Sequence, residues 1–230
     1  MTKNRNLFLL VLSFFLFSIS NAQQNDAELW TGASINKRIA KNILGKYEQQ
    51  LRLNDNISKV KNVFSELGLS MDCNKHIKIS GYYRLSNREL DNGTNAMGHR
   101  FHGDIRVRYK KKPIIFSVRT RMQTENRTKL NGKERSLHNR NRFKIQLDLD
   151  RRISPFIASE VYYDLSGNHF NKVRYTTGLD IDLKNRMGAK IFYRLQREFN
   201  IANPTYSYIV GVGYSYRLRG RLLKNNKGQE

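Results

Sequence analysis

The sequence predicts an all-β chain that forms one antiparallel, up-and-down transmembrane β-barrel. Three observations lead to this fold class: apolar and polar residues alternate along most of the chain, an export leader precedes them, and the alternating segments are long enough to cross a bilayer. A two-residue alternation places apolar side chains on one face of a strand and polar side chains on the other. After the leader, no segment keeps the 3.6-residue apolar period of a helix.

The first element is a leader at residues 1–22. It begins with Lys3 and Arg5, continues as an apolar stretch to Ile19 and ends on the small residue Ala22. This order predicts a cleaved secretory signal peptide, with an uncleaved N-terminal anchor helix as the alternative. The rest of the chain is expected to form a single barrel domain at residues 23–219, followed by a basic C-terminal tail at 220–230.

Eleven segments after the leader alternate, and each is a predicted strand. In chain order they are residues 28–38, 43–54, 59–71, 76–86, 100–109, 113–125, 142–150, 154–165, 171–183, 187–199 and 205–219. Single-chain bacterial barrels have an even number of strands. We therefore expect ten or twelve strands, with twelve preferred: one weak segment is not a strand, a strand is hidden in residues 126–138, or residues 23–27 return through the lumen.

The last segment shows the alternation most clearly. One face carries Tyr206, Tyr208, Val210, Val212, Tyr214, Tyr216 and Leu218. Small, polar and basic residues dominate the other face. Gly211, Tyr214 and Tyr216 resemble the terminal signal by which the barrel-assembly machinery recognises outer-membrane barrels, although this chain continues beyond it into a basic tail.

Strand length, aromatic placement and connection length favour lipid rather than a protein core as the apolar environment. The strands exceed the usual length in globular sheets, and tyrosines such as Tyr83 and Tyr109 recur near the ends of apolar faces, as in an interfacial girdle. Trp30 is interpreted in the same way, as a barrel anchor. Connections alternate between short ones and longer ones, of which the longest are 87–97 and 126–138.

The composition limits the partners. The chain has 42 Lys and Arg against 19 Asp and Glu, a net charge of +23, and one cysteine, Cys73. An exported basic chain meets anionic lipid and lipopolysaccharide rather than nucleic acid, so we expect outer-membrane lipid and lipopolysaccharide as partners. A single cysteine excludes an intramolecular disulfide and a thiolate metal cluster. No cofactor or metal site is expected.

Four short motifs are similar to a family of Bacteroidota outer-membrane barrels, domain of unknown function 2490. They are Glu28-Leu29-Trp30-Thr31-Gly32, the run Glu48 to Asn54, Gly81-Tyr82-Tyr83-Arg84-Leu85 and Gly98-His99-Arg100-Phe101-His102. The resemblance implies the bacterial outer membrane as location and a barrel as fold. It implies no activity, because the family has none assigned.

The residues expected to face the lumen fall into two walls of opposite charge. The basic wall comprises Lys78, Arg84, Arg100, Arg106, Arg108, Arg119 and Arg121. The acidic wall comprises Asp148, Asp150, Glu160, Asp164, Asp180 and Asp182. These walls predict either a pore that selects small polar or anionic solutes or a plug of ion pairs.

We therefore predict a non-enzymatic outer-membrane protein, a narrow channel or a structural envelope component. One alternative is an outer-membrane lipid-modifying enzyme, for which Ser136 and His138 have the nearest spacing, in an expected loop. His99 and His102 are expected on opposite faces of one strand, a poor geometry for binding a metal. A further alternative is a soluble periplasmic lipocalin-like barrel. The basic loop 126–138 also suits contact with lipopolysaccharide phosphates or a protein that the sequence does not identify.

Overall fold

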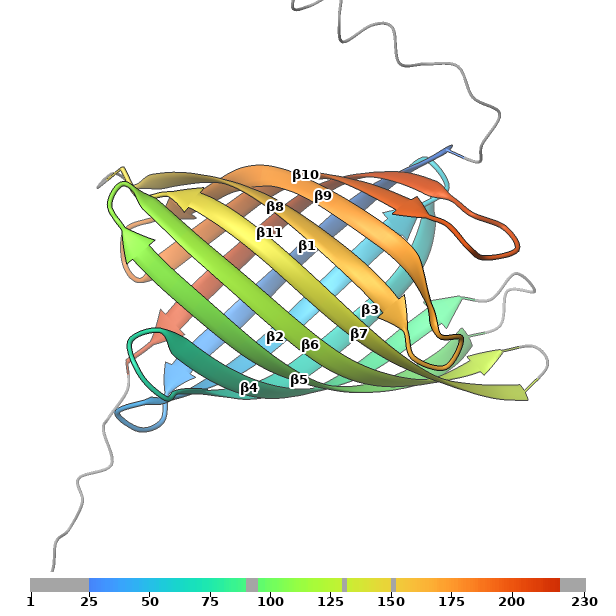
Figure 1. Cartoon of the computed structure of the whole chain (residues 1–230), viewed down its shortest axis with the longest axis horizontal. Coiled ribbons are helices and arrows are strands. Elements are labelled where there is room, and N and C mark those ends of the chain that lie inside the picture. Colours follow the sequence, from blue (N-terminus) through green and yellow to red (C-terminus); the bar gives the residue numbers. More distant parts are fainter. Residues whose placement is uncertain (1–24, 90–94, 130–131, 150–151, 220–230) are drawn as a thin grey trace, which may run out of the picture.

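The computed structural model describes residues 25–89, 95–129, 132–149 and 152–219. They form one closed barrel and no helix (Figure 1). The strands are β1 (Asn25–Arg38), β2 (Ile43–Asn54), β3 (Lys59–Asp72), β4 (Ile77–Glu89), β5 (Asn95–Lys111), β6 (Ile114–Lys129), β7 (Gly132–Leu147), β8 (Ile153–Asp164), β9 (His169–Asp182), β10 (Met187–Glu198) and β11 (Tyr206–Leu218). The expected leader, the expected tail and Asp150 lie outside the described residues.

The barrel closes through a parallel pair. Successive strands pair antiparallel, whereas β1 pairs with β11 in parallel, with Trp30 opposite Gly211. The barrel fold is confirmed, but the described strands number eleven instead of ten or twelve. An odd number of up-and-down strands leaves the first and last running in the same direction, so they can pair only in parallel. Figure 1 shows the β1 and β11 arrows pointing to the same end of the barrel.

The two longest expected connections are largely strand. β4 extends to Glu89 and β5 begins at Asn95, while β6 and β7 continue to Lys129 and from Gly132. Both faces of these segments are polar, so no apolar alternation marks them as strands in the sequence. Backbone pairing nevertheless continues through them, because the hairpin ladder satisfies the main-chain groups whatever the side chains are. The connections at the two ends therefore differ less in length than expected.

The two faces of the barrel differ sharply in chemistry. Large apolar side chains point outward, with Leu67 59%, Ile157 58% and Tyr175 57% exposed. The buried side chains lie inside the barrel and include charged residues as well as Phe64 and Ile209. Along β11 the Tyr and Val face is exposed, as the alternation predicts. Within the described residues, no helix is long and apolar enough to span a membrane.

Candidate functional site: the charged lumen

The lumen holds a cavity of about 950 Å³ to which all eleven strands contribute. Fourteen Lys and Arg residues line it, but only seven Asp and Glu residues do. Three more buried carboxylates do not line the cavity but pair with cations that do. They are Glu28 with Lys61, Asp104 with Arg121, and Glu125 with Arg100. Even when these three carboxylates are added, the cations that line the cavity exceed the carboxylates by four.

Most of the predicted basic wall pairs with carboxylates on neighbouring strands. Arg84 pairs with Glu66 at 2.6 Å, and Arg100 pairs with Glu125 at 2.6 Å. Arg121 donates two hydrogen bonds to Asp104, at 2.6 and 2.7 Å. These three carboxylates were not predicted from the sequence. They lie directly opposite their arginines in the strand register, which the sequence alone does not specify.

The remaining members of the basic wall are Lys78, Arg106, Arg108 and Arg119, of which Arg119 also lines the cavity. Lys78 pairs with Asp72 at 3.0 Å near the end of the barrel where β3 finishes. Arg106 and Arg108 are exposed. Arg119 extends past β7 and pairs with Glu160 on β8 at 2.6 Å. Among the ion pairs of the described residues, this is the one that connects the basic wall to the acidic wall.

Glu160 is the centre of the acidic wall. It accepts hydrogen bonds from Arg140 at 3.0 Å and from Arg119, and Arg174 lies 3.7 Å away. Two other members pair locally: Asp180 with Lys144 at 2.7 Å and Lys190 at 3.0 Å, and Asp148 with Lys110. Asp164 lies 3.8 Å from His138, and Asp182 is exposed at the end of β9. Most ion pairs of the acidic wall are therefore formed with basic residues outside the predicted basic wall.

The aromatic ring of Trp30 contacts three of the lumen cations. The guanidinium carbons of Arg52, Arg194 and Arg174 lie 3.7, 4.9 and 5.5 Å from the ring centroid of Trp30. We call these four residues the Trp30 cluster. Arg52 donates to Gln50 and Arg194 to Thr176, but within the described chain neither forms an ion pair with a carboxylate. Cation–π contact stabilises such arginines without neutralising them.

Trp30 lies inside the lumen, so its interpretation as a lipid-facing anchor was wrong. It is 4% exposed, and its Nε1 donates a hydrogen bond to Glu28 at 2.8 Å. Its ring meets Phe192 edge to face, with centroids 6.4 Å apart. The sequence contains a signal for this position, since Glu28, Trp30, Gly32 and Ser34 share the polar face of one alternating segment.

The expected insertion signal includes a residue with a clear packing role. Gly211 faces the lumen under the Phe192 ring, where an added Cβ would lie 2.0 Å from Phe192 Cζ. Tyr214 and Tyr216 are exposed on the outer face. Whatever Gly211 does during insertion, the folded barrel needs a glycine there to admit the aromatic ring.

The histidines are dispersed. His99 is on the outer face beside Tyr83, whereas His102 is buried and stacks on Tyr82 with centroids 4.8 Å apart. His138 lies in strand β7 and not in a loop. Among the described residues, no group of three His, Cys, Asp or Glu side chains is placed to hold a metal ion.

Comparison with known proteins gives a family and two similar folds. No curated protein matches the chain. The β domain of the Bordetella autotransporter BrkA has a TM-score of 0.47 and 10% identity over 74% of this chain and 82% of that chain. The translocator domain of autotransporter NalP from Neisseria meningitidis has a TM-score of 0.46 and 12% identity over 74% and 72%. A family model matches residues 27–207, and the chain therefore belongs to the family described as protein of unknown function (DUF2490).

Proposed function

We propose that this protein is a non-enzymatic outer-membrane β-barrel whose electropositive lumen binds small anions and conducts them as a narrow channel. The observation that carries the proposal is the excess of cations around the lumen cavity, concentrated at the Trp30 cluster. Fixed cationic side chains in a low-dielectric passage attract anions and repel cations, which is how charged rings select ions in channels.

Membrane insertion is supported by the outer surface. Every one of the eleven strands carries at least one large apolar side chain that is exposed on this surface. Soluble monomers rarely expose continuous apolar patches larger than a few hundred Å². A soluble lipocalin-like barrel has the reverse arrangement, with an apolar interior around its ligand. Lipid is the environment that suits the outer face, and the predicted export leader favours the outer membrane.

Side chains that fill part of the lumen make the passage narrow. Phe64 is 2% exposed and lies under the guanidinium of Arg84, with 3.6 Å between the guanidinium carbon and the ring centroid. Together with the Trp30 cluster, these rings occupy space that a wide porin leaves to water. The proposed channel therefore suits inorganic anions and small organic acids, not large solutes.

The test is single-channel recording of the refolded protein in planar bilayers under a potassium chloride gradient. We expect small conductance steps and a reversal potential that shows chloride permeating faster than potassium. Arg52→Gln and Arg194→Gln should each reduce this anion preference. Arg197→Gln removes one positive charge from an exposed position on β10 and serves as the matched control. The absence of steps above background would contradict the channel and favour a structural plug.

A further inference from the structure

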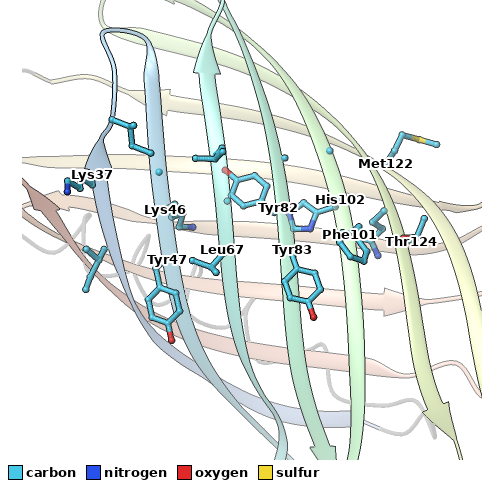
Figure 2. A pocket seen from close by; sticks show the side chains of 18 of the residues that line it. Lys37, Lys46, Tyr47, Leu67, Tyr82, Tyr83, Phe101, His102, Met122 and Thr124 are labelled. Atoms are coloured by element: carbon cyan, nitrogen blue, oxygen red, sulfur yellow. The ribbon is translucent and has the colours of Figure 1, made fainter. Parts of the chain in front are cut away.

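The outer face of β1 to β7 contains an apolar groove of about 910 Å³, on the opposite side of the barrel wall from the lumen (Figure 2). Its outward-facing lining is almost entirely hydrocarbon and aromatic, from residues such as Leu67, Phe101 and Met122. In Figure 2 the side chains of Tyr47 and Tyr83 stand along one side of the groove. A hollow of this size on a surface otherwise covered by large side chains needs a local cause.

The cause is a pair of glycines on the outer face. Gly81 on β4 lies directly opposite Gly103 on β5, and Leu69 and Met122 are their next partners in the same row. An added Cβ at Gly81 would have no atom within 4 Å, and one at Gly103 would have only Ser80 O, at 3.9 Å. The space above both glycines is therefore open.

Most other glycines in the barrel strands have a packing reason that this pair lacks; Gly213 also has open space above it, but it faces the lumen. Inside the lumen, a Cβ at Gly68 would lie 1.9 Å from Tyr82 Cδ1, and one at Gly211 would collide with Phe192. Those glycines make room for rings of the protein itself. Gly81 and Gly103 make room for nothing within the described chain, which points to an occupant from outside it.

In the strand register, rows of large side chains lie on both sides of the glycine row. Toward one end of the barrel lie Leu67, Tyr83 and Phe101, with the Tyr83 and Phe101 ring centroids 4.9 Å apart. Toward the other end lie Met71, Ile79 and Ile105. The two rows are four residues apart along each strand, or about 13 Å at 3.3 Å per residue. The glycine row lies midway between these two rows, so the open space above Gly81 and Gly103 is an elongated strip narrower than that distance.

A basic residue lies at one end of the groove. The row of Gly81 continues through Leu69 to Gly45, and Gly45 lies opposite Lys37. Lys37 is exposed near the end of β1, and no ion pair involves it in the described structure. Gly103, by contrast, lies in the middle of β5. The groove thus runs from a cation near the rim of the barrel to the middle of its apolar surface.

We infer that this groove binds one acyl chain of an anionic phospholipid, with the headgroup phosphate at Lys37. Lysines near the edge of an apolar surface extend their ammonium groups to the polar boundary, where anionic phosphates lie. A second copy of this chain fits less well. A two-fold interface places the same patch on both subunits, and two hollows that face each other would fill neither. The inference rests on the proposed location in a membrane.

The experiment compares lipid binding by four forms of the full-length barrel extracted from membranes in mild detergent. They are the wild type, the double variant Gly81→Leu/Gly103→Leu, Lys37→Gln and the control Thr177→Leu, which adds the same apolar side chain to an exposed position on β9. Native mass spectrometry counts the bound lipid and identifies it by mass. After removal of the bound lipid, phosphatidylglycerol and phosphatidylethanolamine are added back separately, and their binding is compared. A gel-shift assay confirms that each form is folded.

We expect one phosphatidylglycerol on the wild type and on Thr177→Leu, and none on the double glycine variant. Lys37→Gln should weaken phosphatidylglycerol binding about fivefold and leave phosphatidylethanolamine binding nearly unchanged. Equal lipid binding by the double variant would overturn the inference, as would lipopolysaccharide in place of phospholipid or a dimer that the double variant abolishes.

The same variants separate this inference from the proposed channel. The groove is on the outer face, so the double glycine variant should keep the wild-type conductance while it loses the lipid. A barrel that binds the lipid but shows no conductance would contradict only the channel. Recovery of the protein in the soluble periplasmic fraction would contradict both.

Discussion

The carboxylate of Glu28 accepts a hydrogen bond from the indole Nε1 of Trp30 at 2.8 Å and pairs through its other oxygen with Lys61 at 2.6 Å. Glu28 is fully buried, so the two contacts satisfy a carboxylate that water does not reach. The same hydrogen bond helps to fix the ring on which Arg52, Arg174 and Arg194 gather. One carboxylate on β1 therefore positions the cationic centre of the lumen without neutralising it.

Replacing Glu28 should destabilise the barrel. Glu28→Ala leaves Lys61 and the Trp30 indole without their partner, for an expected loss of about 1–3 kcal/mol in the free energy of unfolding. Urea unfolding in detergent micelles measures this loss. Asp55→Asn is the control, since it removes an exposed pair with Lys59 and should change stability by less than about 1 kcal/mol. Equal effects of the two variants would show that burial of Glu28 is unimportant.

Glu160 should be harder to replace than any exposed carboxylate. Arg119, Arg140 and Arg174 converge on it, and Glu160→Gln leaves their charges facing one another in a buried site. The expected loss is about 3–5 kcal/mol, as for other broken buried ion pairs. Added chloride should restore part of this loss by entering the lumen, so unfolding is measured at low and at high chloride. Asp72→Asn, which breaks the more exposed pair with Lys78, should respond little to chloride.

Variants at Gly211 and Phe192 can separate the packing role of Gly211 from its expected role in membrane insertion. Gly211→Ala places a Cβ against the Phe192 ring, and overpacking of this kind costs about 1–3 kcal/mol. Phe192→Leu in the same chain should recover most of that stability, which urea unfolding of the refolded protein measures. Assembly into membranes in cells is the second readout. If stability recovers but assembly does not, Gly211 also acts as part of the insertion signal.

The alternation of residues was sufficient to predict the strands. Each of the eleven alternating segments overlaps one of the eleven strands, because the alternation reflects the two chemically different faces. The boundaries were less predictable at residues 87–97 and 126–138, where both faces are polar. The expected number of strands was ten or twelve because such barrels generally have an even number. The parallel β1–β11 pair closes a barrel with an odd number instead.

The inner face of several strands was predictable from the alternation, but the pairing of its residues was not. The alternation assigns Arg84 and Arg121 to the inner face, and both line the cavity. Their partners, Glu66 and Asp104, depend on how neighbouring strands are aligned, and a shift of one residue would move each side chain to the other face. The Trp30 cluster joins residues from β1, β2, β9 and β10, which become neighbours only when the barrel closes.

Ile157 provides the most direct test of the environment of the outer face. It is 58% exposed and lies well inside the twelve-residue strand β8. In water, replacing an exposed isoleucine by lysine changes stability little, usually within about 0.5 kcal/mol. In the middle of a bilayer the same change costs about 2–4 kcal/mol, because the ammonium group loses its hydration. We therefore expect Ile157→Lys to destabilise the barrel refolded in phospholipid vesicles by that larger amount, as measured by urea titration.

Ile57→Lys is the matched control, because Ile57 is 44% exposed in the turn between β2 and β3 and should lie beyond the hydrocarbon. If both lysines were tolerated equally well, the outer face would not be in contact with lipid, and the membrane location would have to be abandoned together with the channel.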